Sequence, residues 1–194
     1  IIIWDFGFFG GSFNPPSYTH INLAKKLISE YNLDKIYFVP VGNYYEKSSL
    51  IEAKHRYNML KLAIEDKMDV EKIAIESKVK LYAIDTFELL KEKYNKDDIF
   101  FIMGSDNFRK MPTWKNYEKL KTNYNIIVIE RERKKIRNEN QKNIIEFIPE
   151  KLAEIDSTQI REMFKNNEKN VKKYLNPKVY EYIQKNNLYM GQIN

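Results

Sequence analysis

Residues 10–20 read Gly-Gly-Ser-Phe-Asn-Pro-Pro-Ser-Tyr-Thr-His, and a helical pattern of apolar residues follows them at once. The preceding run, residues 1–9, is Ile-Ile-Ile-Trp-Asp-Phe-Gly-Phe-Phe, which predicts a buried first strand. We expect Gly10 and Gly11 to form a turn in which the backbone approaches an anion closely. A helix with His20 in its first turn adds unpaired N–H groups and a partial positive charge. This order predicts a phosphate site, with a plain strand-to-helix turn as the alternative.

Strand-like apolar runs and helical patterns alternate along the rest of the chain. Strands are predicted at residues 35–39, 72–75, 99–103, 125–129 and 144–148, and helices at 53–66, 82–94, 158–166 and 177–186, with a short helix near Val171. Such alternation is typical of a mostly parallel sheet that carries helices on both faces. We therefore predict a Rossmann-like, doubly wound α/β fold. It forms one domain over residues 1–194, with an α/β core at 1–150 and a helical part at 151–194.

The composition limits the classes of protein to which the chain can belong. Of its 194 residues 43% are hydrophobic and 31% are charged, which is typical of a folded globular protein. The absence of cysteine excludes disulfides and cysteine metal sites. No apolar run approaches the ~20 residues of a membrane helix, so we expect a cytoplasmic protein with no membrane partner. Because the sequence starts at Ile1 rather than Met, we expect it to be part of a longer one.

The net charge of +6 suits polyanionic partners such as nucleotides and nucleic acid. The lysines are dispersed along the chain, however, and the run Arg-Glu-Arg-Lys-Lys at residues 131–135 is typical of a solvated loop. We therefore predict that nucleic acid is not a partner.

Segments with polar or glycine residues follow three of the predicted strands, at residues 10–20, 40–47 and 104–106. In parallel sheets, ligands bind beyond the carboxyl ends of the strands, so we expect these segments to meet. Lys47 can reach an anion there as a flexible point charge, or it can be an ordinary solvated lysine. Asp106 can accept hydrogen bonds from ribose hydroxyls, unless Ser105 or Asp106 only caps a helix.

Two further segments carry side chains that suit a nucleotide. Trp114 offers a surface on which a flat heterocycle can stack, although a loop tryptophan often only fills space. At residues 156–161, Asp-Ser-Thr-Gln-Ile-Arg opens a helix, and Asp156 or Ser157 can cap it. Arg161 then lies about one turn into that helix, so the segment predicts a second anion site. Two helix N-termini with a histidine, a lysine and an arginine around one cleft would suit a triphosphate.

Together these motifs resemble the nucleotidyltransferase superfamily with an (H/T)-x-G-H signature, and more narrowly the nicotinamide/nicotinate mononucleotide adenylyltransferases. The resemblance covers about residues 6–189. The matching segments are residues 10–15, 40–47 with 50–51 and 55–56, 84–87, 104–106 with 114–115, 156–161 and the ending 174–189. The chain departs from the signature at Ser17 and Thr19, which replace its first His and its Gly. Asp156 replaces a serine of the S-S-T motif.

The resemblance implies that AMP passes from ATP to nicotinamide or nicotinate mononucleotide, giving a dinucleotide and pyrophosphate. It implies direct attack on the α-phosphorus, with Mg²⁺ held mainly by the ATP phosphates and no metal cluster of the protein. The implied catalytic residues are His20, Lys47 and Arg161. Binding of ATP and its phosphates is implied for Gly10, Gly11, Ser12, Phe13, Ser17, Ser157 and Thr158. Binding of the mononucleotide or a ribose is implied for Thr86, Gly104, Asp106, Trp114 and Arg131. Relatives of this kind often assemble, so a homo-oligomer is compatible with the resemblance.

Two alternatives stay open at the level of sequence. The departures at Ser17, Thr19 and Asp156 are compatible with a degenerate domain that binds nucleotides without catalysis. A related adenylyl- or cytidylyltransferase that acts on another phosphorylated acceptor is the second alternative. Trp114 and the match at the C-terminal end of the chain favour the pyridine mononucleotide. The choice between nicotinamide and nicotinate is not fixed by the sequence.

Overall fold

The fold is described from a computed structural model, over residues 5–95, 99–130, 142–149 and 155–191. Its centre is a parallel sheet of strands β1 (Phe6–Gly11), β2 (Lys35–Pro40), β3 (Met68–Val70), β4 (Ile99–Gly104), β5 (Asn125–Ile129) and β6 (Ile144–Phe147). The strand order is β3-β2-β1-β4-β5-β6, with every neighbouring pair parallel. This is the order of the doubly wound dinucleotide-binding fold, with its switch point between β1 and β4. The predicted fold class is confirmed.

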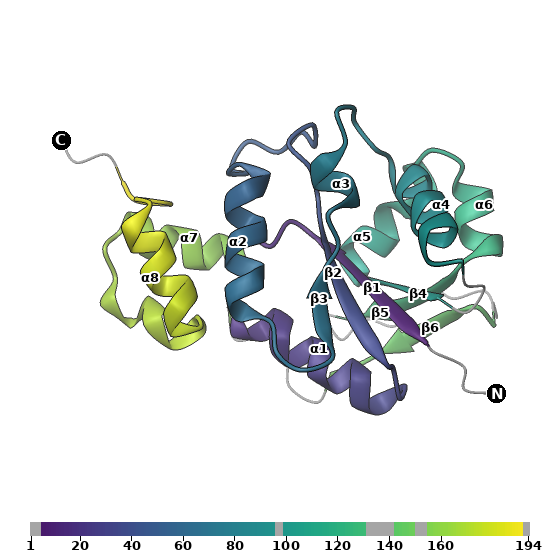
Figure 1. Cartoon of the computed structure of the whole chain (residues 1–194), viewed down its shortest axis with the longest axis horizontal. Coiled ribbons are helices and arrows are strands. Elements are labelled where there is room, and N and C mark those ends of the chain that lie inside the picture. The colour runs from purple at the N-terminus through teal and green to yellow at the C-terminus, as the bar shows by residue number, and fades with distance from the viewer. Residues whose placement is uncertain (1–4, 96–98, 131–141, 150–154, 192–194) are drawn as a thin grey trace.

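Helices cover both faces of the sheet because the strands are apolar on both sides. Successive residues of β1 point to opposite faces, so Phe9 joins one core cluster and Phe8 the other. The cluster around Phe9 includes side chains of α1 (Tyr18–Glu30) and α2 (Ala53–Ala63). The cluster around Phe8 includes side chains of α4 (Ala83–Tyr94) and α6 (Tyr117–Asn123). The two layers are visible at either side of the sheet in Figure 1.

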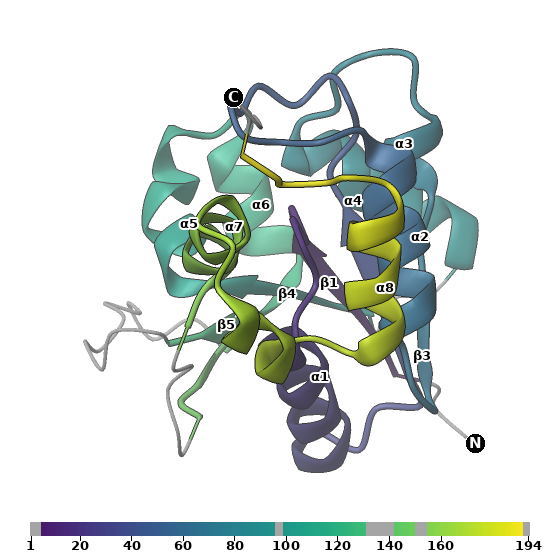
Figure 2. The same ribbon diagram turned by 90° about the vertical axis from the view of Figure 1, so that its left-hand side faces the viewer.

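The C-terminal helices extend the first of these layers. They are α7 (Ser157–Lys165), the 3-10 helix η2 (Lys169–Tyr174) and α8 (Pro177–Lys185). Ile160, Val179 and Ile183 are buried in the same core cluster as the side chains of α1 and α2. Figure 2 shows α8 running beside α2, with α7 close to the end of β1. No helix in the described ranges is long and apolar enough to cross a membrane.

Residues 72–75 were predicted as the third strand, and this prediction is wrong. The strand is β3, which is only three residues long, and the chain then turns into the short helix α3 (Ile73–Glu76). The turn depends on Glu71, whose side chain is 3% exposed and accepts a hydrogen bond from the Ile73 N–H at 3.1 Å. Lys93 and Tyr94 of α4 donate to the same carboxylate. A four-residue apolar run cannot reveal a turn that a buried side chain from elsewhere imposes.

The two glycines at residues 10 and 11 were predicted to form the turn after β1, but they lie within the strand. The left-handed conformation falls instead at Phe13, whose φ is 49°. A Cβ atom at Gly11 would lie 3.0 Å from the Phe13 ring, so a larger residue there would have to shift that ring. A Cβ atom at Gly10 would meet no atom within 4 Å, so this glycine leaves the space beyond the strand open.

Candidate active site

Residues 12–17, here called loop 12–17, lead from β1 into α1 and place His20 in the first turn of that helix. Ser17 is the N-cap, and its backbone N–H donates to Nδ1 of His20 at 3.0 Å. Since an N–H can only donate, Nδ1 must accept, so the neutral imidazole carries its proton on Nε2. The Ser17 hydroxyl lies 3.1 Å from the same nitrogen, and the Phe13 ring packs edge-on against the imidazole. The histidine is thereby fixed as a donor through Nε2.

The N-terminus of α7 is held by two side-chain hydrogen bonds to loop 12–17 and by one to Ser49. Arg161 donates from Nη1 to the Asn14 carbonyl at 2.8 Å and from Nη2 to the Ser49 hydroxyl at 3.2 Å. The Ser157 hydroxyl donates to the Pro15 carbonyl at 2.9 Å. Asp156 is the N-cap of α7 and accepts from the Gln159 N–H at 2.8 Å. The structure therefore brings the N-terminus of α7 to the loop that leads to His20.

Lys47 lies in the exposed loop between β2 and α2, close to the same cluster of charges. Its pKa is lowered from 10.5, first by partial burial and then by Arg161, while Asp106 and Asp156 oppose the shift. The direction follows from the loss of solvation and from a neighbouring positive charge, which both disfavour the ammonium form. Lys47 is thus close enough to interact with Arg161 and with Asp106, and the segments of Lys47 and Asp106 both follow strands, as predicted.

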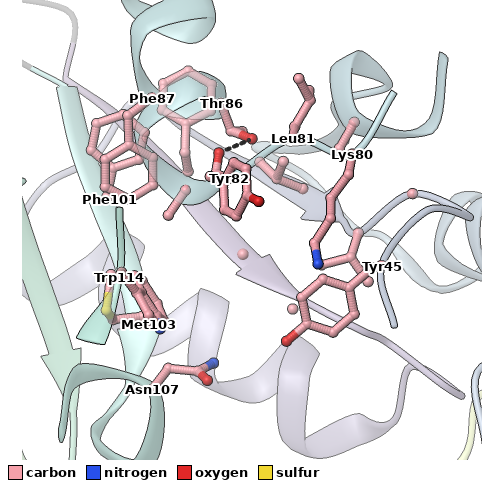
Figure 3. A pocket seen from close by; sticks show the side chains of 18 of the residues that line it. Tyr45, Lys80, Leu81, Tyr82, Thr86, Phe87, Phe101, Met103, Asn107 and Trp114 are labelled. Atoms are coloured by element: carbon pink, nitrogen blue, oxygen red, sulfur yellow. Dashed lines mark hydrogen bonds between the residues drawn. The ribbon is translucent and has the colours of Figure 1, made fainter. Parts of the chain in front are cut away.

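A cavity of about 400 Å³ opens beside this cluster, at the carboxyl ends of β1, β2 and β4. Its apolar wall includes Phe87 and Phe101, whose rings are stacked at 3.5 Å between centroids. Figure 3 shows Trp114 with Met103 and Asn107 on one side, and Tyr45 with Lys80 on the opposite side. Gly10, Gly11 and Ser12 also line the cavity. An apolar pocket of this size with a few polar groups is typical of a small-molecule site.

The charged side chains that line the cavity are positive. Among the described residues that line it, Lys80, Lys110 and Lys115 are basic and no side chain is acidic. Lys115 pairs with Asp85 at 3.2 Å, and Lys80 pairs with Glu46 at 3.5 Å, but neither carboxylate lines the cavity. The positive charge favours an anionic ligand.

The predicted residues therefore fall into two neighbouring groups. His20, Ser157 and Arg161 contact loop 12–17, and Lys47 and Thr158 interact with Arg161. Thr86 and Trp114 line the cavity, and Gly10, Gly11 and Ser12 line it where the loop begins. The Thr86 hydroxyl donates to the Tyr82 carbonyl at 3.3 Å, within its own helix. Arg131 lies outside the described residues.

The segment at residues 104–106 forms the start of helix α5 (Ser105–Lys110), with Gly104 rather than Ser105 or Asp106 as the N-cap. The Ser105 hydroxyl instead donates to the buried Glu130 carboxylate at 3.1 Å, and Arg109 donates to that carboxylate at 3.2 Å. Asp106 is exposed and does not line the cavity, but its neighbours Asn107 and Lys110 do.

Sequence reasoning missed the three cavity lysines and the two buried carboxylates, Glu71 and Glu130. Lys80 comes from the loop before α4, whereas Lys110 ends α5 and Lys115 follows shortly after it, so their approach depends on tertiary structure. The carboxylates each follow a strand directly, after Val70 and Ile129, and that position was the available signal. A charged residue next to a buried strand end must find partners, because an unpaired buried charge is costly.

Comparison with known proteins identifies the family. Residues 8–163 match the family profile described as Cytidylyltransferase-like. The nicotinate-nucleotide adenylyltransferase of Bacillus subtilis is 33% identical over 188 residues, which cover 94% of this chain and 97% of that protein. The chain belongs to the cytidylyltransferase-like family, among the nicotinate-nucleotide adenylyltransferases. The resemblance found in the sequence is confirmed.

Solved structures of Plasmodium falciparum nicotinic acid mononucleotide adenylyltransferase are also similar to this adenylyltransferase. The structure complexed with NaAD has a TM-score of 0.79 at 26% identity, and the one complexed with APC has 0.79 at 28%. Each match covers 96% of this chain and 98% of the other. The likeness therefore extends over the sheet and over the C-terminal helices.

Proposed function

We propose that this adenylyltransferase transfers AMP from ATP to nicotinate mononucleotide, forming nicotinate adenine dinucleotide and pyrophosphate. The observation that carries the proposal is the cavity, which is aromatic and lined by lysines, and which opens at Gly10–Ser12 onto the loop leading to His20. A pyridine nucleotide needs an aromatic wall for its ring and positive charge for its acidic groups. The names of the relatives, and the NaAD held by the Plasmodium enzyme, support the same substrates.

In the proposed mechanism the 5′-phosphate of the mononucleotide attacks the α-phosphorus of ATP in line with the leaving pyrophosphate. One P–O bond forms and one breaks, and no covalent enzyme intermediate is required. The protein contributes positioning and stabilisation of charge. His20, with its proton on Nε2, would donate to the α-phosphate as negative charge builds there.

Lys47, Arg161 and the Ser157 hydroxyl would hold the β- and γ-phosphates of ATP. Their positions near loop 12–17, where Arg161 and Ser157 contact the Asn14 and Pro15 carbonyls, support this assignment. Trp114 would stack on the pyridine ring, with Thr86 nearby, and Asp106 would accept from a ribose hydroxyl. Asp156 is occupied as a helix cap, so its carboxylate is held by Gln159 beside the phosphates.

Mg²⁺ would enter with ATP as part of the substrate. No group of three or more His, Asp or Glu side chains suited to a metal ion occurs in the described residues. The ion would be held mainly through the substrate phosphates, as is usual for Mg²⁺. The ion would neutralise part of the phosphate charge and ease departure of pyrophosphate.

The test is release of pyrophosphate from MgATP with nicotinate or nicotinamide mononucleotide, each assayed separately. The proposal predicts turnover with both or with nicotinate mononucleotide alone, and a higher kcat/KM for nicotinate because the cavity is cationic. Parallel reactions with CTP in place of ATP, or with phosphopantetheine as acceptor, test the related transferases. Binding of ATP without pyrophosphate release from either mononucleotide would contradict the proposal and favour a non-catalytic nucleotide-binding domain.

A further inference from the structure

Arg56 stands out because it is fully buried and carries a positive charge. Its exposed fraction is 0%, on a face of α2 whose other buried residues are Ala53, Met59, Leu60 and Ala63. Burial lowers its pKa to about 10, so the guanidinium remains charged at neutral pH. Its Nη2 has no hydrogen-bond partner within the described parts of the chain, and none of the ion pairs found there includes it. An uncompensated buried charge is expensive for a protein to keep.

The two hydrogen bonds of Arg56 connect it to both loops of the proposed ATP site. Nη1 donates to the Ser12 carbonyl at 3.0 Å, at the start of loop 12–17. Nε donates to the Ile51 carbonyl at 3.0 Å, in the segment that follows Lys47 and Ser49. One planar, rigid head therefore fixes the spacing between two segments that a smaller cation could not hold together.

The guanidinium of Arg56 interacts electrostatically with the Tyr189 side chain. Tyr189 interacts electrostatically with both Arg56 and Arg161, and its pKa is raised, chiefly by burial. The Tyr189 hydroxyl donates to Oδ1 of Asn14 at 2.7 Å, and Asn14 is itself 1% exposed. Arg161 donates to the Asn14 carbonyl on the other side. The positive charge of Arg56 thus lies against the start of loop 12–17, and Tyr189 interacts with both this charge and that of Arg161.

We propose that Arg56 is a positioning residue for the ATP polyphosphate: it sets the spacing of loop 12–17 and the Lys47–Ile51 segment, and the bound phosphates balance its buried charge. The proposal rests on the proposed function only in taking loop 12–17 as the phosphate site. It predicts that the contribution of Arg56 to affinity grows with the number of phosphates, because each added charge interacts with the guanidinium. If Arg56 only supported the fold, its substitution would weaken the binding of ATP, ADP and AMP equally.

The experiment is calorimetric titration of MgATP, MgADP and AMP without mononucleotide, into the wild-type chain and into Arg56→Gln, Arg56→Lys and Tyr182→Phe. The control Tyr182→Phe removes hydrogen bonds from His55 and Asn58, so it perturbs the same helix α2 without changing charge. We expect Arg56→Gln to reduce the ratio Kd(AMP)/Kd(ATP) about tenfold, with the AMP affinity nearly unchanged. Tyr182→Phe should leave that ratio at the wild-type value.

Arg56→Lys keeps the proposal testable if Arg56→Gln does not fold. The pKa of the substituted lysine would be lowered by burial, so it would lose its charge as the pH rises, whereas Arg56 would not. The titrations are repeated at pH values from about 6.5 to about 9, roughly one unit apart. Over this range the ratio Kd(AMP)/Kd(ATP) should fall in Arg56→Lys by more than it changes in the wild type. A pH-independent difference, or an equal loss for ATP and AMP in Arg56→Gln, would overturn the proposal. These titrations measure binding and not turnover. A failure of the proposed reaction would therefore show in the pyrophosphate assay and not here.

Discussion

The cavity and loop 12–17 adjoin at one edge of the sheet but are built in different ways. The cavity is an open space between aromatic walls, in which Phe87, Phe101 and Trp114 offer flat surfaces and lysines supply charge. Loop 12–17 is buried and belongs to a network of hydrogen bonds within the chain. The network includes Asn14 and Ser17 of the loop, His20 of α1 and Arg161 of α7. On the proposed function, one substrate would be recognised by shape and stacking and the other by fixed charge. Substitutions in the two regions should therefore affect different kinetic constants.

The largest expected effect is that of His20→Ala. If Nε2 donates to the α-phosphate during transfer, kcat should fall by about a hundredfold to a thousandfold, while ATP affinity changes little. Pyrophosphate release under saturating substrates measures this. The matched control is His55→Ala, because His55 is the second of the two histidines and bonds to Tyr182 between α2 and α8. An equal loss of kcat in both variants, or none in His20→Ala, would remove the proposed role.

Arg161→Gln should act on the ATP side alone. Loss of its charge and of its hydrogen bonds to Asn14 and Ser49 should raise the KM for ATP by roughly tenfold or more, with the KM for the mononucleotide nearly constant. Initial rates over a grid of both substrate concentrations separate the two constants. A larger change for the mononucleotide would contradict the division into two regions.

Trp114→Ala should show the opposite pattern. Loss of the stacking surface is expected to raise the KM for nicotinate mononucleotide about tenfold, while the KM for ATP stays near the wild-type value. Trp114→Phe retains a ring and should recover most of the affinity, which distinguishes stacking from simple support of the cavity wall. Unchanged mononucleotide KM in Trp114→Ala would mean that the ring binds elsewhere.

The smallest expected effect is on stability, in Lys47→Met. The pKa of Lys47 is lowered in the folded protein, so its charged form is less favourable there than in the unfolded chain. At pH values well below 10.5, the substitution should therefore raise the melting temperature slightly in the absence of ATP. The gain should shrink as pH rises through the lowered pKa and vanish toward 10.5, the ordinary value.

A thermal melt of Lys47→Met against wild type at pH 7 and at pH values near 10 measures this gain, with the ATP KM as a second readout. We expect that KM to rise, because the substitution removes a cation from the proposed phosphate site. A lower melting temperature at neutral pH would show that Lys47 supports the loop instead of straining it.

The order of strands and helices was largely predictable, because the sequence of a buried parallel strand is a continuous run of apolar residues. The runs at 99–103 and 125–129 coincide with β4 and β5 to within one residue. The failure at 72–75 arose where Glu71 turns the chain through contacts from α4, which no local pattern contains.

The convergence of the predicted site followed from one rule, that parallel strands end at the same edge of the sheet. The composition of the cavity did not follow, because Lys80 and Lys115 reach it from loops, and Lys110 from the end of α5, along paths that no local pattern encodes. Arg56 left a visible signal, since it interrupts the apolar stripe of Ala53, Met59, Leu60 and Ala63 on α2. A charged residue on a buried helix face should have suggested a polar neighbour, here the Ser12 carbonyl.

The central claim is that the cavity receives the pyridine ring while loop 12–17 receives the phosphates. It is tested most directly by a crystal structure with nicotinate mononucleotide, Mg²⁺ and a non-hydrolysable ATP analogue bound together. The account predicts the pyridine ring against Trp114 and the α-phosphate within hydrogen-bond reach of Nε2 of His20. Adenine in the cavity, or phosphates remote from His20, would contradict it.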